Sequence, residues 1–162
     1  MIILLRKAKK MYENILVPLD GSSNSIQAEK EALKLAKKFN SKIILLSVIS
    51  EANLFLSVGT GPSTGSTAVP LDWQKSARAF AQSILSNGEK KAKNNNVEVK
   101  TITEEGPAKK VIADFPKNHK VDLVVIGKSG KDSIDRFLIG STTSYVVRNS
   151  PVEVLVVNDK SS

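Results

Sequence analysis

Glycine and hydroxyl residues follow directly after one of the apolar runs of the chain. Gly127 follows the run Val121–Ile126, and Gly130, Gly140 and Ser141 come after it with the spacing G-x2-G-x9-G-S. Glycines let backbone N–H groups turn toward a ligand without interference from a Cβ atom, and consecutive N–H groups in such a turn form a concavity that binds anions. A helix that begins near Ser141 would add unpaired N–H groups and a partial positive charge. The spacing therefore predicts a phosphate site at the end of a buried strand.

A structural interpretation of the same positions stays open. The glycines also suit a tight turn followed by a helix cap. Ser141, Thr142 and Thr143 suit the N-terminus of a helix, and Lys128 suits a solvent-exposed position. Asp20, which follows the first apolar run, is either a carboxylate for a ligand or a turn residue ahead of a helix.

Composition excludes several kinds of chemistry. The 162 residues include no cysteine and one histidine, so there is no basis for a disulfide, a thiolate metal site or a Ser-His-Asp triad. The net charge of +8 would favour nucleic acid or an anionic membrane, but the lysines are scattered along expected helices and aromatic residues make up only 5%. No apolar stretch is long enough to span a membrane or to form a signal peptide. We therefore expect a cytoplasmic protein that binds neither nucleic acid nor membrane.

Apolar periodicity predicts alternating strands and helices. We expect strands at 15–19, 42–49, 97–103, 121–126 and 152–157, and helices at 25–39, 72–94, 107–115 and 141–149. Pro116 should end the third helix near Phe115, and the strand at 97–103, in which polar and apolar residues alternate, should lie at a sheet edge. Repeated β–α units imply an α/β fold with a doubly wound parallel sheet flanked by helices. Such sheets bind ligands beyond the carboxyl ends of their strands, where the strand order reverses.

The remaining segments are not part of this pattern. Residues 50–70 are rich in Gly, Pro, Ser and Thr, which is typical either of a surface loop or of a lid over a ligand. We assign residues 1–10 to an N-terminal extension, 11–158 to a single domain and 159–162 to a C-terminal tail.

Taken together, several segments resemble the universal stress protein family. They are Ile15–Ser22, Glu105–Ala108, Val121–Gly127, the G-x2-G-x9-G-S spacing and the closing run Ser150–Val157. The resemblance covers residues 11 to about 158. It implies a five-stranded parallel sheet of order 3-2-1-4-5, an adenine nucleotide alpha hydrolase-like, Rossmann-like fold. It also implies the branch of the family that binds ATP, since the other branch lacks the glycine spacing.

The resemblance further implies roles for individual residues. Asp20 would contact the ribose or the base, with Pro18 beside it, and Val48 and Ile126 would line the adenine pocket. The phosphates would lie against Gly127, Lys128, Gly130, Gly140, Ser141, Thr142 and Thr143. Many relatives have histidine in the turn where this chain has Lys128 and Ser129, which leaves the number of phosphates, and so ATP or AMP, open. Mg²⁺ would accompany ATP, and a homodimer would form through the last strand, Val152–Val157.

Three classes of function are compatible with these features. We favour a nucleotide-dependent regulatory protein of the stress response with slow or no ATP hydrolysis, because no general base for activating water is evident. One alternative is an interaction module of the same fold that binds no nucleotide. The other is an ATP-using enzyme of the same wider group, which would need a glycine-rich loop after the first strand, where Asp20–Ser25 contains a single glycine.

Overall fold

The computed structural model of the protein describes residues 11–50, 71–129 and 139–158. Within these ranges the elements follow one another as β1 (Asn14–Pro18), α1 (Ser23–Phe39), β2 (Lys42–Ile49), α3 (Leu71–Asn94), β3 (Val99–Glu105), α4 (Ala108–Asn118), β4 (Leu123–Gly127), α5 (Ser141–Asn149) and β5 (Glu153–Val157). The strands form one sheet in the order β3-β2-β1-β4-β5, and all of the neighbouring pairs are parallel. This confirms the predicted α/β fold and its strand order.

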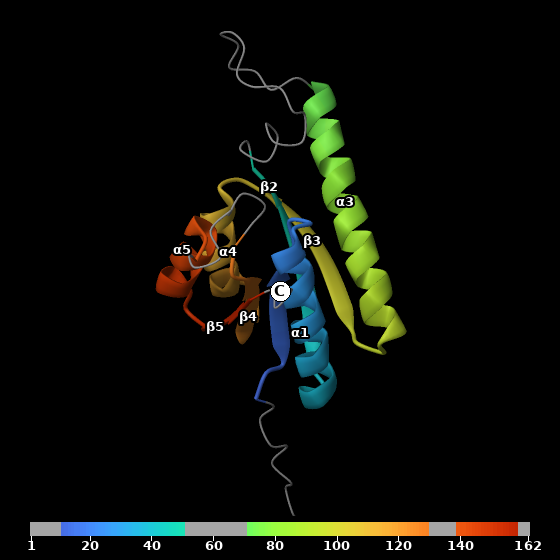
Figure 1. Ribbon diagram of the computed structural model, residues 1–162, viewed down its shortest axis with the longest axis vertical. Coiled ribbons are helices and arrows are strands. Elements are labelled where there is room, and N and C mark those ends of the chain that lie inside the picture. The colour runs from blue at the N-terminus through green and yellow to red at the C-terminus, as the bar shows by residue number, and fades with distance from the viewer. Residues whose placement is uncertain (1–10, 51–70, 130–138, 159–162) are drawn as a thin grey trace, which may run out of the picture.

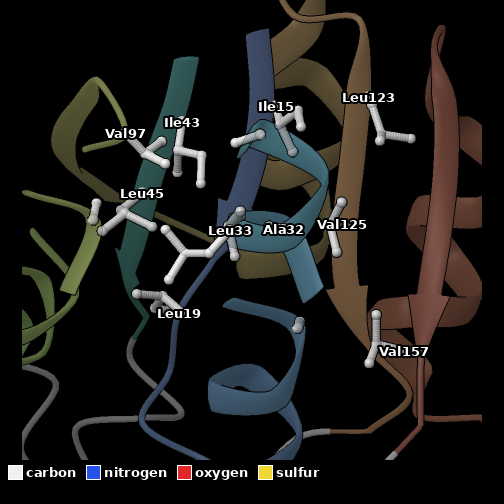
Figure 2. Close-up of a cluster of buried hydrophobic side chains, with 14 of the residues drawn as sticks. Ile15, Leu19, Ala32, Leu33, Ile43, Leu45, Val97, Leu123, Val125 and Val157 are labelled. Carbon is white, nitrogen blue, oxygen red and sulfur yellow. The ribbon is translucent and has the colours of Figure 1, made fainter. Parts of the chain in front are cut away.

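Helices cover both faces of this sheet (Figure 1). On the face covered by α1 and α3, side chains such as Ile15, Leu45 and Val125 form one buried cluster, which Figure 2 shows in close-up. On the face covered by α4 and α5, Leu16 and Val124 belong to a second buried cluster. Because successive residues of a strand point to opposite faces, burial of both faces explains why the sequences of β1, β2 and β4 are nearly continuous apolar runs.

The strand order reverses next to β1, the central strand. The chain builds β2 and β3 on one side of β1 and then crosses to build β4 and β5 on the other side. In parallel sheets of this kind, ligands bind beyond the carboxyl ends of the two strands at which the order reverses, here β1 and β4. The segments that follow Pro18 and Gly127 both start at this edge.

An ion pair with a buried carboxylate joins the two helices on the α1 face. The Glu29 side chain in α1 is 3% exposed, and its Oε2 lies 2.7 Å from Nζ of Lys91 in α3. Its Oε1 is buried and has no hydrogen-bond partner in the described part of the chain. A Cβ atom at Gly88 would lie 2.7 Å from this Oε1, so glycine lets α3 pack closely against the carboxylate.

The expectation that Pro116 ends its helix near Phe115 is wrong, because α4 continues to Asn118. A proline removes one helical hydrogen bond through its missing N–H group, but in the last turn this loss affects a single carbonyl group. The ring of Pro116 is buried, and His119 stacks on Phe115 with 3.8 Å between ring centroids. Burial and stacking outweigh the lost bond.

The bounds of β2 and α5 are those expected, and, apart from the end of α4, the other element boundaries differ by at most two residues. The third strand begins and ends two residues later, at Val99 and Glu105, and it lies at a sheet edge as expected.

Residues 1–10, 51–70 and 159–162, which include most of the Gly- and Pro-rich connection, lie outside the described residues. Among the described helices, none combines the length and the hydropathy needed to cross a membrane.

Candidate functional site

Three apolar residues line the carboxyl edge on the α4/α5 face of the sheet. Pro18 ends β1 and pairs with Leu46 of β2, and Val48 lies two residues beyond Leu46. Ile126, the penultimate residue of β4, belongs with Val48 to the cluster on this face. Pro18 shares the face of Leu16, because alternate residues of a strand point the same way. The residues expected around an adenine ring thus meet at one edge and one face, where Pro18 and Ile126 are buried and Val48 is half-buried.

Asp20 lies in the turn that connects β1 to α1. Its Oδ1 accepts two hydrogen bonds from Ser22, from the backbone N–H at 2.9 Å and from the hydroxyl at 2.6 Å. Among the described residues, its Oδ2 has no hydrogen-bond partner. Gly21 between them has φ +79°, a left-handed conformation that favours glycine. Asp20 is therefore a turn residue, and it still has one carboxylate oxygen without a protein partner in the described part of the chain.

The turn after β4 is closed by backbone hydrogen bonds. The N–H of Lys128 donates to the carbonyl of Val157 in β5 at 2.7 Å, and the N–H of Gly140 donates to the carbonyl of Lys128 at 2.9 Å. The chain therefore returns at Gly140 to the point where it left the sheet, and α5 begins at the next residue, Ser141. Gly130 lies outside the described residues.

Space, rather than backbone conformation, explains the glycine at position 140. Its φ is −58°, which any residue adopts, but a Cβ atom there would lie 3.1 Å from Cα of Ser129. This is closer than the 3.5–4.0 Å at which carbon atoms normally pack. A larger residue would push the start of α5 away from the turn.

Several polar groups of the glycine motif are already bonded within the protein. The N–H groups of Lys128 and Gly140 have backbone acceptors, and the hydroxyl of Thr143, a residue that is 3% exposed, donates to the carbonyl of Gly127 at 2.8 Å. The backbone N–H groups of Ser141, Thr142 and Thr143 lie in the first turn of α5, where no helical acceptor precedes them. Unpaired N–H groups at a helix N-terminus, together with the helix dipole, are groups that can attract an anion.

Sequence reasoning missed a contact between α1 and this turn. Nδ2 of Asn24, in the first turn of α1, donates to Oγ of Ser129 at 2.9 Å. A Cβ atom at Gly127 would lie 2.7 Å from the backbone carbonyl carbon and oxygen of Asn24. Gly127 therefore lets the start of α1 pack on the end of β4. Residues 24 and 129 are too far apart in the chain for their spacing to signal this contact.

Two charged side chains, Lys128 and Asp20, lie in the turns at the carboxyl edge of the sheet. Lys128 is half-buried within the turn, and Asp20 is half-buried in the turn that follows β1. No group of three or more acidic or histidine side chains that could hold a metal ion occurs in the part of the chain that the structure describes. The arrangement offers an apolar wall, one carboxylate and a set of backbone donors, which together suit a ligand with an aromatic base and a phosphate group.

Comparison with known proteins identifies the family of the chain. The model of the universal stress protein family matches residues 11–158. Universal stress protein MJ0531 of Methanocaldococcus jannaschii is 30% identical over 154 residues, which cover 95% of this chain and 86% of that protein. Universal stress protein UspA from Lactobacillus plantarum has the same fold, with a TM-score of 0.74 and 28% identity over 90% of this chain and 97% of that chain. A universal stress protein in complex with cAMP, 24% identical with a TM-score of 0.65, covers 91% of this chain and 97% of that chain and shows the fold alone. By sequence and by fold, the chain belongs to the universal stress protein family.

Proposed function

We propose that this protein binds an adenine nucleotide at the carboxyl edge of the sheet, between the Asp20 turn and the start of α5. The base would pack on Pro18, Val48 and Ile126, and the phosphates would lie at the N-terminus of α5. Binding would make the protein a nucleotide-dependent regulator of the stress response, with slow or no hydrolysis.

The hydrogen bond from Gly140 N–H to the Lys128 carbonyl, 2.9 Å long, carries this proposal. It keeps the first turn of α5 beside the end of β4, so that the helix donors lie next to the apolar edge residues. A helix N-terminus in this position favours a phosphate through its unpaired N–H groups and its dipole. The universal stress protein in complex with cAMP, which has the same fold, is consistent with an adenine nucleotide as the ligand class.

Slow hydrolysis is expected from the groups at this edge. A general base must reach the attacking water and accept its proton, and Asp20 is the carboxylate of the turn after β1. Its Oδ1 is engaged by two hydrogen bonds from Ser22, and in the proposed arrangement the carboxylate faces the ribose or the base rather than the phosphates. Mg²⁺, when present, would be held mainly by phosphate oxygens of the nucleotide, as is usual for this ion.

A thermal shift of the nucleotide-stripped protein tests the proposal. ATP, ADP, AMP and GTP are each added with and without Mg²⁺. A ligand at 100 times its Kd stabilises the folded state by about 2.7 kcal/mol, which raises the Tm of a domain of this size by about 5–10 °C. A shift with ATP or AMP but not with GTP supports an adenine site. No shift with any nucleotide contradicts it and favours an interaction module.

We also propose a homodimer that forms through β5. This strand is an edge of the sheet, and an edge strand leaves backbone groups that a second copy can pair with. Leu155 is 39% exposed, whereas Val154 and Val156 pack against the cluster under α4 and α5. Leu155→Asp is therefore the better test, since Val154→Asp would also disturb the core. We expect the variant to have the mass of a monomer by light scattering at micromolar concentration, and an unchanged dimer mass, or a monomeric wild-type protein, would contradict the proposal.

A further inference from the structure

Ser22 joins the Asp20 carboxylate to the start of α1. Both of its donors, the backbone N–H and the hydroxyl, bond to the same oxygen of Asp20, at 2.9 and 2.6 Å. Ser22 is also the N-cap of α1, where its Oγ accepts from the N–H of Ser25 at 3.2 Å. It is 8% exposed, so solvent does not compete strongly for these bonds.

The direction of the Ser22 hydroxyl proton follows from this arrangement. The N–H of Ser25 is a donor, so Oγ must accept from it. A hydroxyl group has one proton to give, and the carboxylate Oδ1 at 2.6 Å is the acceptor that it reaches. Hydrogen bonds to a charged acceptor of this kind are short and strong.

Ser22 itself is held firmly by α1. Its carbonyl accepts from the N–H of Ile26 at 3.0 Å and from the hydroxyl of Ser25 at 2.9 Å. The helix that follows packs its buried residues Ala28, Ala32 and Ala36 against the core. Because Ser22 is fixed in this way, it cannot follow a rotation of the Asp20 carboxylate, which would break both hydrogen bonds between the two residues.

We infer that Ser22 is a positioning residue for nucleotide binding. By holding Oδ1, it fixes the rotation of the Asp20 carboxylate and leaves Oδ2 to accept from a ribose hydroxyl or a base N–H of the ligand. A side chain that is ordered before binding loses less conformational entropy when the ligand arrives. This inference rests on the proposed function, because it assigns a role within the same adenine nucleotide site.

The chain offers matched variants for a test. Ser22→Ala removes the hydroxyl bond to Asp20, and Ser22→Thr retains a hydroxyl at the same position. Ser25→Ala is the control, since it deletes a neighbouring buried hydroxyl that bonds to the Ser22 carbonyl but does not contact Asp20. Asp20→Ala and the double variant with Ser22→Ala complete a double-mutant cycle.

Isothermal titration calorimetry with ATP, well below the lowest Tm of the set, gives the Kd of each variant. We expect Ser22→Ala to weaken binding about three- to tenfold, the range for one hydrogen bond, and Ser22→Thr and Ser25→Ala to stay within about twofold of the wild-type protein. In the Asp20→Ala background, Ser22→Ala should have no further effect, because Ser22 acts through that carboxylate.

Three results would overturn the inference. Unchanged affinity of Ser22→Ala shows that the hydroxyl does not position Asp20. An equal loss in the presence and in the absence of the Asp20 carboxylate shows a general structural role of the helix cap. A wild-type protein that binds no adenine nucleotide refutes the proposed function and this inference together, whereas the first two results leave the proposed function standing.

Discussion

Gly127→Ala tests whether the opening residue of the glycine motif acts through packing. The added Cβ would lie 2.7 Å from the carbonyl carbon and oxygen of Asn24 and 2.9 Å from its Cβ. Carbon atoms normally pack at 3.5–4.0 Å, so a shift of roughly 1 Å is required. The obstructing atoms include the backbone of α1, which cannot rotate away as a side-chain end does. Overpacking of this kind costs about 1–3 kcal/mol, and we expect a value of about 2–3 kcal/mol here because backbone must move.

Thermal and urea denaturation of the nucleotide-free variant measure this loss. For a domain of this size, about 2–3 kcal/mol lowers the Tm by about 5–10 °C. Gly140→Ala is the matched control, since its Cβ would lie 3.1 Å from Cα of Ser129 and requires a smaller movement of a turn rather than of a helix. A Gly127→Ala protein that melts within about 2 °C of the wild-type protein would refute the packing argument.

Two further predictions concern the site and the core. Gly140→Val should weaken nucleotide binding at least about tenfold by calorimetry while lowering the Tm by only a few degrees, because it moves the start of α5 away from the turn; near wild-type affinity would contradict the assignment of the phosphate site. Lys91→Met should lower the free energy of unfolding in urea by about 1–3 kcal/mol, since it leaves the buried Glu29 charge without its cation, although the solvent around Lys91 reduces the loss. Adding Glu29→Gln should restore much of this stability, and a double variant less stable than Lys91→Met alone would argue against an uncompensated charge as the cause.

The fold was predictable because its signals are local and repeated. Apolar runs such as Lys42–Ile49 and the periodic pattern of α1 recur along the chain, and β–α repeats leave few possible topologies. The strand order came from the family resemblance rather than from these patterns. The end of α4 was predicted wrongly, because the rule for proline considers one lost hydrogen bond, whereas burial of Pro116 and stacking of His119 on Phe115 depend on the tertiary structure.

The candidate site was predictable in its residue types but not in their bonding. Sequence spacing indicated which residues follow β1 and β4, and the fold brings them to one edge. The sequence spacing did not indicate that Asn24 donates a hydrogen bond to Ser129. Nor did it indicate that the hydroxyl of Thr143 donates to the carbonyl of Gly127. Such contacts join positions that only the folded sheet makes neighbours.

The hydrogen bonds at this edge divide the glycine motif into two sets of groups. The N–H groups of Lys128 and Gly140 and the hydroxyl of Thr143 connect β4, β5 and α5, while the first N–H groups of α5 lack helical acceptors. The same short segment therefore serves both the fold and the proposed ligand site. A substitution in it that abolishes nucleotide binding is evidence for a role in the ligand site only if the Tm of the nucleotide-free protein falls by no more than a few degrees. By this criterion Gly127 would be assigned to packing and Gly140 to the phosphate site, although the two belong to one sequence motif.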